Sequence, residues 1–124
     1  MSRVLRFIVA AALAVAAEAA WADGDAARGE KKFEECQSCH SLDRNAESVG
    51  PSLFGMFGRK AGAGADFRYS PAMKRSGITW TAQTVDTFLT DPQAVVAANR
   101  MPYAGMPAAG DRADLIAFLQ KTFN

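Results

Sequence analysis

Two cysteines and the only histidine of this chain stand together, as Cys36, Cys39 and His40 in the run Cys-Gln-Ser-Cys-His. Two thiols separated by two residues and followed directly by histidine form the attachment signature of c-type haem. The sulfurs can form thioether bonds to the haem vinyl groups, which carries the histidine under the ring, where an imidazole nitrogen reaches the iron. The motif therefore predicts one covalently attached haem c, anchored by Cys36 and Cys39, with His40 as an axial ligand.

Other chemistries that use such residues fit this chain less well. A thioredoxin-like redox pair occurs next to a βαβ pattern, and no segment of the chain alternates convincingly as a strand. A structural zinc site needs about four ligands, whereas the chain has no further cysteine or histidine. A disulfide that encloses only two residues would remove little entropy from the unfolded chain. A chance occurrence of the pattern is the last alternative.

A sixth ligand for the iron would come from a soft donor, and the candidates beyond the N-terminal segment are Met56, Met73, Met101 and Met106. Met101 is favoured because it lies in a proline-flanked loop, far enough from His40 for the chain to reach the other face of the ring. Met106 shares this loop and is the main rival. Met56 could pack in the core or on the haem edge, and Met73 lies in a short helix where packing is expected.

The first 22 residues have the pattern of a secretory signal that is cleaved from the mature protein. Arg3 and Arg6 precede an apolar run over residues 7–17, which ends near the small-residue pattern Ala20-Trp21-Ala22. An uncleaved N-terminal anchor is the alternative, although the apolar run is short for a membrane span. Cleavage after Ala22 would leave residues 23–124 as one exported domain, in the periplasm and without stable membrane insertion.

The composition is that of one small globular domain. Of the 124 residues, 49% are hydrophobic and 22% are charged, which excludes a disordered or multi-domain chain. The formal net charge of +1 gives no support to nucleic-acid binding, which requires a clustered basic surface. Removing the predicted signal also removes two of the 14 basic and one of the 13 acidic side chains, so the mature chain is formally neutral.

Capping residues and apolar spacing predict an all-α domain of about four to five short helices wrapped around the haem. Asp25, Ser70 and Asp111 are expected to cap three of the helices, and Thr81 is expected to begin another. The expected helices span residues 26–36, 71–76, 81–89, 92–96 and 111–123. Segments 50–66 and 97–110, which are rich in glycine and proline, are predicted to be loops that a large buried ligand holds in place.

Together these features resemble class I cytochrome c, especially the periplasmic bacterial kind that is close to mitochondrial cytochrome c. The similar stretches occur in the family's order over the whole predicted mature chain. Besides the haem motif they are Gly24–Gly29, Gly50–Leu53, Phe57–Lys60, Gly77–Trp80, Arg100-Met101, Ala104-Gly105 and Asp114–Leu119. The resemblance implies that the first and last helices cross, with Gly29 and Phe33 against Leu115 and Phe118.

The resemblance also implies how the axial ligands are arranged. The carbonyl of Pro51 would accept a hydrogen bond from the ring nitrogen of His40 that does not bind iron, which orients the imidazole and strengthens it as a ligand. Met101 would be the sixth ligand, a choice over Met106 that depends on the resemblance. Arg59, Tyr69 and Trp80 would hydrogen-bond or pair with the haem propionates, whose burial would otherwise be costly.

The chain departs from the family pattern in three places near the expected sixth ligand. Ala97-Ala98 replaces a frequent Pro-Gly, and Asn99, which we include among the haem-binding residues, replaces a frequent threonine. Phe88 stands where many relatives have a tyrosine whose hydroxyl reaches the methionine sulfur. Loss of that hydrogen bond is expected to alter the redox potential and the stability of the ligand loop.

The predicted function is that of a soluble one-electron carrier rather than an enzyme. It would shuttle between respiratory or photosynthetic redox complexes as a monomer that binds its redox partners transiently. One alternative is a dedicated haem subunit of a periplasmic dehydrogenase or reductase. A gas-binding or peroxidase-like haem protein is disfavoured, because such proteins often carry the motif near the C-terminus of a four-helix bundle.

Overall fold

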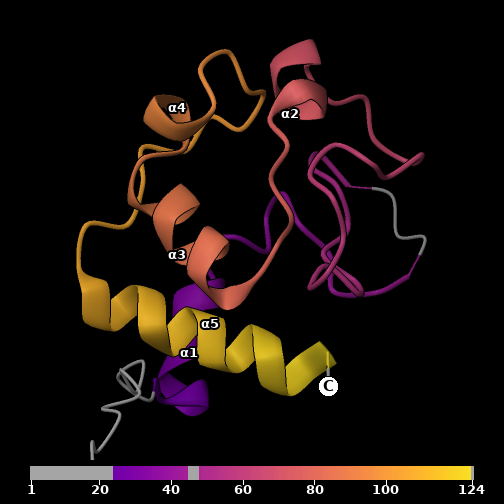
Figure 1. Cartoon of the computed structure of the whole chain (residues 1–124). Helices are drawn as coiled ribbons and strands as arrows, with labels where there is room; N and C mark the ends of the chain where they lie inside the picture. Colours follow the sequence, from indigo (N-terminus) through magenta and orange to yellow (C-terminus); the bar gives the residue numbers. More distant parts are fainter. Residues whose placement is uncertain (1–23, 45–47, 124) are drawn as a thin grey trace, which may run out of the picture.

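The computed structural model describes residues 24–44 and 48–123, in which five helices are connected by long loops (Figure 1). The helices are α1 (Ala26–Phe33), α2 (Pro71–Arg75), α3 (Ala82–Thr90), α4 (Pro92–Val95) and α5 (Ala109–Phe123). These ranges contain no β-strand and one isolated antiparallel bridge, between Lys60 and Thr79, so the predicted all-α class is confirmed. None of the described helices is long and apolar enough to cross a membrane. The predicted signal over residues 1–22 lies outside the described residues.

Three helices begin at the side chains that the sequence pattern predicts. Asp25 Oδ1 accepts a hydrogen bond of 2.8 Å from the N–H three residues later. Ser70 Oγ accepts one of 3.1 Å in the same way, and Thr81 and Thr84 form a reciprocal capping box at the start of α3. Each cap satisfies a backbone donor that the helix leaves without a partner, which is typically worth ~1 kcal/mol.

Two predicted boundaries are wrong. The first helix ends at Phe33 rather than near Cys36, because the chain tightens there into turns in which the N–H of Cys36 donates to the carbonyl of Phe33 over 2.8 Å. The last helix begins at Ala109, so Asp111 lies in its first turn and is not its cap. The Asp111 carboxylate is still favourable there, because it lies at the positive end of the helix dipole and pairs with Lys32 at 3.2 Å.

Helices α1 and α5 cross in direct contact, as Figure 1 shows. Gly29 permits the close approach, because a Cβ at this position would lie 1.9 Å from the carbonyl oxygen of Asp114. The rings of Phe33 and Phe118 lie 5.6 Å apart beside it. At the edge of the contact, Arg28 Nε donates to Asp114 Oδ2 over 2.8 Å. The predicted crossing of the two terminal helices is thus confirmed.

Two apolar clusters build the interior. The first joins α1, α3 and α5 through the buried residues Phe33, Met56, Val85, Leu89, Met106, Leu115, Ile116 and Leu119. The second joins α2, α3 and the chain after α4 through Ala61, Met73, Phe88 and Val96. Trp80 packs against both clusters, so it links the two halves of the domain.

Candidate haem-binding site

A cavity of about 320 Å³ is lined by residues of both apolar clusters. This volume lies in the ordinary range of ligand sites, roughly 300–1,000 Å³. All of the residues predicted for the haem site line it, namely Cys36, Cys39, His40, Pro51, Arg59, Tyr69, Trp80, Asn99 and Met101. The fold therefore brings segments from α1 to α5 around one largely apolar space.

Cys36 and Cys39 reach the cavity from a tight turn that follows α1. The N–H groups of Cys39 and His40 both donate to the carbonyl of Cys36, over 3.1 and 2.9 Å. Neither thiol forms a disulfide. Burial raises the pKa of the Cys36 thiol to about 11, and the negative charges of Glu35 and Cys39 add to the shift. Surroundings that disfavour a charged thiolate suit the uncharged sulfur of a thioether.

The His40 ring is held by the backbone that follows it. Its Nδ1 lies 2.7 Å from the carbonyl oxygen of Pro51. A neutral imidazole that donates through Nδ1 keeps the lone pair of Nε2 for a metal. Gly50, for which the sequence suggested no role, makes the approach possible, because a Cβ there would lie 2.9 Å from both His40 Cε1 and the Cys39 carbonyl oxygen.

The donor set fits haem and no other metal site that the sequence suggested. Within residues 24–44 and 48–123, no group of three or more histidine, cysteine, aspartate or glutamate side chains could hold a metal ion. The zinc alternative therefore has no site in this part of the chain. Two thiols that can form thioether bonds to the vinyl groups, one oriented imidazole and a methionine sulfur around an apolar cavity are the groups that a covalently attached haem uses.

The four candidate methionines differ in their surroundings. Met56, Met73 and Met101 line the cavity, whereas Met106 does not. Met106 is 4% exposed and packs inside the first apolar cluster. Met56 and Met73 are also buried members of the clusters. Met101 is half-buried, lies outside the helices and packs against the edge of the second cluster.

The buried side chain of Asn99 organises the loop that contains Met101. Its Nδ2 donates to the carbonyls of Pro92 and Val96, over 2.8 and 3.0 Å. Its Oδ1 accepts hydrogen bonds from the Met101 N–H at 2.7 Å and from Gln93 Nε2 at 3.0 Å. Asn99 thus acts on the loop backbone as well as lining the cavity. Gln93 carries no sequence signal for this role, because it lies in the four-residue helix Pro92–Val95 and belongs to no motif.

Arg59, Tyr69 and Trp80 line the cavity from the loops before and after α2. The Arg59 guanidinium donates to two backbone carbonyls, each over 3.3 Å, and pairs with no carboxylate of the described residues. It therefore has donors left for an anionic group. Burial raises the pKa of the Tyr69 hydroxyl, although the charge of Arg59 opposes this. The Trp80 ring packs edge-on against Phe88 with centroids 5.1 Å apart.

Glu35 and Tyr103 also line the cavity, and the sequence did not single them out. The Tyr103 hydroxyl donates to Glu35 Oε2 over 3.1 Å. Partial burial, followed by this hydrogen bond and the charge of Glu35, raises the pKa of Tyr103 to about 12. The two residues belong to segments that are far apart in the chain, so no local pattern predicts their contact.

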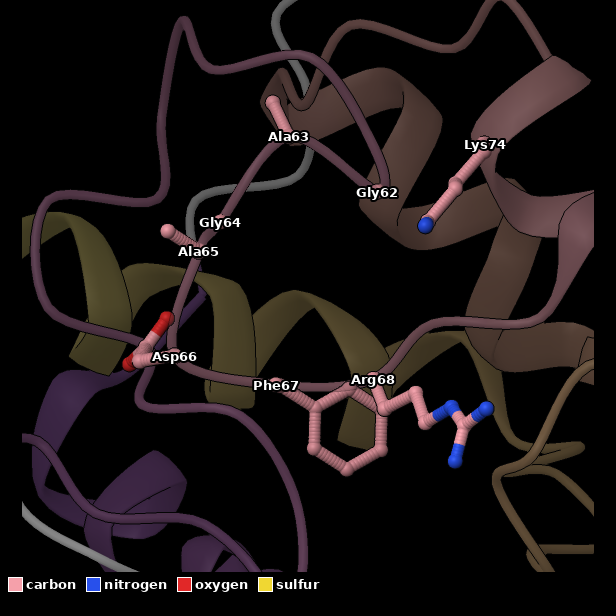
Figure 2. A pocket seen from close by; sticks show the side chains of 8 residues that line it. All are labelled: Gly62, Ala63, Gly64, Ala65, Asp66, Phe67, Arg68 and Lys74. Atoms are coloured by element: carbon pink, nitrogen blue, oxygen red, sulfur yellow. The ribbon is translucent and has the colours of Figure 1, made fainter.

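A second and more open hollow of about 580 Å³ lies beside the haem cavity and shares Phe67 with its lining (Figure 2). Its lining consists of the loop 62–68 and Lys74 of α2. Figure 2 shows Asp66, Phe67 and Arg68 along one stretch of this loop, with Lys74 on the other side of the hollow. Its charged side chains have opposite signs and are exposed, and none of them belongs to a motif. The residues with recognisable chemistry thus gather in the first cavity.

Comparison with known proteins shows the family of the chain. The family model described as Cytochrome c matches residues 26–123. Cytochrome c2 of Rhodomicrobium vannielii is 40% identical over 118 residues, which cover 94% of each chain. Cytochrome c2 of Blastochloris viridis is 42% identical over 119 residues, covering 95% of this chain and 89% of that protein. Cytochrome c type-1 of Ascaris suum is 39% identical over 100 residues, covering 80% and 89%.

The family match covers both the helices that build the cavity and the residues that line it. The chain therefore belongs to the cytochrome c family, as an electron-transfer protein that carries one covalently attached haem c rather than an enzyme.

Proposed function

We propose that this protein is a periplasmic one-electron carrier whose haem iron is bound by His40 and Met101. The observation that carries the proposal is the shared cavity, which both side chains line although they come from distant parts of the sequence. The hydrogen bond from His40 Nδ1 to Pro51 supports ligation through Nε2. The core position of Met106 favours Met101 as the sulfur ligand from this loop.

When bound, the haem supplies reversible one-electron chemistry at its iron. Asn99 holds the backbone of Met101 in place, and Pro51 holds the ring of His40. The apolar lining excludes water and favours the less charged ferrous state, which raises the potential. With His40 and Met101 both bound to the iron, no open position would remain for a substrate, and little would rearrange when an electron arrives or leaves.

Arg59, Tyr69 and Trp80 are assigned to the haem propionates. Buried carboxylates need hydrogen-bond donors or a compensating charge, and these side chains offer a guanidinium, a hydroxyl and an indole N–H. The free donors of Arg59 support the assignment.

The mature protein is proposed to be a monomer of residues 23–124, formed when the signal over residues 1–22 is cleaved during export. Its partners would be redox proteins of respiratory or photosynthetic chains, bound through small and short-lived interfaces. Purification from the native host tests this. A processed, free carrier is expected, whereas a fixed stoichiometry with one dehydrogenase or reductase would favour a dedicated subunit, and a retained N-terminus would contradict cleavage.

Optical spectra of the oxidised holoprotein test the axial ligation. A sulfur-to-iron charge-transfer band at the red end of the visible spectrum is expected in the wild type and should disappear in Met101→Ala. Met106→Leu is the matched control and should keep the band. Persistence of the band in Met101→Ala would show that another residue supplies the sulfur.

Carbon monoxide binding to the reduced protein separates the carrier from a gas-binding haem protein. The wild type should bind slowly, because Met101 must leave first, and Met101→Ala should bind rapidly. Rapid binding that Met101→Ala leaves unchanged would favour the gas-binding alternative.

A further inference from the structure

The loop from Asn99 to Met106 borders the cavity and is anchored at both ends. Asn99 is buried and bonds to the chain around α4. At the other end, the N–H of Met106 donates to the carbonyl of Leu89 over 2.7 Å. Gly105 packs closely on α3, because a Cβ there would lie 2.3 Å from the carbonyl oxygen of Thr90. The middle of the loop depends on other contacts.

Two side chains extend from the middle of this loop in different directions. Arg100 Nη1 donates to the carbonyl of Arg68 over 2.7 Å. Tyr103 donates to Glu35 Oε2 over 3.1 Å. Among the described residues, the Tyr103–Glu35 contact is the only hydrogen bond or ion pair that joins residues 99–106 to the haem-attachment segment 34–53.

This hydrogen bond is exposed to solvent, and both of its side chains line the cavity. Glu35 is exposed and lines the cavity, and Tyr103 is half-buried with its ring against the first apolar cluster. Glu35 directly precedes Cys36, and Tyr103 follows Met101 by two residues. The contact therefore ties together two segments that line the same cavity although they are far apart in the sequence.

We propose that Glu35 and Tyr103 form a latch that closes the cavity mouth, keeping Met101 at the iron and limiting the entry of small molecules. Both are positioning residues, since they act through the loop and not on the iron. The effect on ligand exchange rests on the proposed ligation by Met101. The effect on loop motion does not rest on that ligation, because the Glu35–Tyr103 hydrogen bond joins the two segments whichever group binds the iron.

Binding of imidazole to the oxidised holoprotein tests the latch. Imidazole must displace Met101 from the iron, so a holoprotein with a looser loop should bind imidazole more tightly. Tyr103→Phe keeps the ring packing and removes the hydroxyl, and we expect it to raise the association constant about three- to tenfold, the equilibrium effect of losing one hydrogen bond. Glu35→Ala should do the same. The association constant of the combined variant should exceed that of neither single variant by more than twofold, because both substitutions remove the same contact.

Glu34→Ala is the matched control for charge. Glu34 is an exposed carboxylate beside Glu35, and its side chain has no hydrogen bond among the described residues. Glu34→Ala should change the association constant for imidazole less than twofold. Glu35→Gln, which keeps an acceptor oxygen, should change it less than Glu35→Ala does. An unchanged association constant in Tyr103→Phe, or a full effect of Tyr103→Phe in the Glu35→Ala background, would overturn the latch.

Hydrogen exchange of the backbone amides of Met101 and Tyr103 in the holoprotein separates the two proposals. Loss of the latch should speed this exchange about three- to tenfold, with no change in exchange within α1 and α5. If the wild type lacks the sulfur-to-iron band and binds imidazole as tightly as Met101→Ala, the proposed ligation by Met101 is wrong. Hydrogen exchange is then the only test of the latch. Unchanged exchange in both Tyr103→Phe and Glu35→Ala would refute it.

Discussion

The backbone N–H of Met101 donates a hydrogen bond of 2.7 Å to Oδ1 of Asn99, whose side chain is buried beneath the loop. Nδ2 of the same Asn99 side chain donates to two carbonyls near α4. The Asn99 side chain therefore supplies hydrogen-bond partners to the irregular backbone around Met101. The proposed ligand loop thus depends on a residue that is not itself a ligand.

Asn99→Ala should lower the free energy of unfolding of the holoprotein by about 2–3 kcal/mol, because it removes the acceptor of the Met101 N–H and two further hydrogen bonds, to the carbonyls of Pro92 and Val96. Denaturant unfolding of the oxidised protein measures this. Gln83→Ala, which removes an exposed amide from α3, is the control and should stay within about 0.5 kcal/mol of the wild type. Equal stability of both variants would contradict the role given to Asn99.

Ala98→Gly should stabilise the protein. Ala98 is the only residue other than glycine with a positive φ in the described ranges, at 64°, and this left-handed conformation is costly for a residue with a Cβ. Glycine removes that strain and adds unfolded-state entropy, so a net gain of about 0.5–1 kcal/mol is expected. Thermal unfolding compares it with Ala97→Gly, which relieves no such strain and should be destabilising. A loss of stability in both variants would argue against strain at Ala98.

Gly29→Ala should disrupt the crossing of α1 and α5. The new Cβ would lie 1.9 Å from the Asp114 carbonyl oxygen, so the helices must separate, at a cost of about 3 kcal/mol. Gly110→Ala, in the first turn of α5, is the matched control, because no atom lies within 4 Å of its new Cβ. It should be neutral or stabilising by up to ~1 kcal/mol. Equal melting temperatures of the two variants would contradict the close approach at Gly29.

Acidification should remove the contribution of the Arg28–Asp114 pair to the free energy of unfolding. The hydrogen bonds from Arg28 and from the N–H of Asp25 lower the pKa of Asp114 below its usual value of 3.8. A carboxylate whose pKa is lower in the folded state stabilises the protein above its unfolded pKa, and this stabilisation is lost as the pH falls through the folded pKa. The effect should be modest, because Arg28 is 66% exposed.

Unfolding free energies measured between about pH 2 and 7 test this, with Asp114→Asn as the comparison. The difference between wild type and variant should be largest near neutral pH and should shrink below about pH 4. A difference in unfolding free energy that stays constant over this range would show that the Arg28–Asp114 pair does not cause the loss of stability at low pH.

The local features of the fold could be predicted because the groups that produce them are close in sequence. Asp25 and Ser70 accept hydrogen bonds from N–H groups three residues away, so the starts of α1 and α2 follow from short patterns. The haem motif is contiguous because two sulfurs and one imidazole must reach the same ring. The end of the first helix was not predictable in this way, since it is followed by the turns after Phe33. The last helix begins before the predicted cap Asp111, where the N–H of Arg112 donates to the carbonyl of Ala108 over 3.2 Å.

Tertiary packing gives different surroundings to residues of the same type. Met101 and Met106 lie in one loop and carry the same thioether, and the resemblance to class I cytochrome c was needed to choose between them. In the structure, the Met106 N–H bonds to Leu89 and its side chain fills the core between α3 and α5, whereas Met101 lines the cavity. The contact of Glu35 with Tyr103 likewise exists only in the fold. The chemistry of a donor is local, but the direction in which it points depends on contacts with residues far away in the chain.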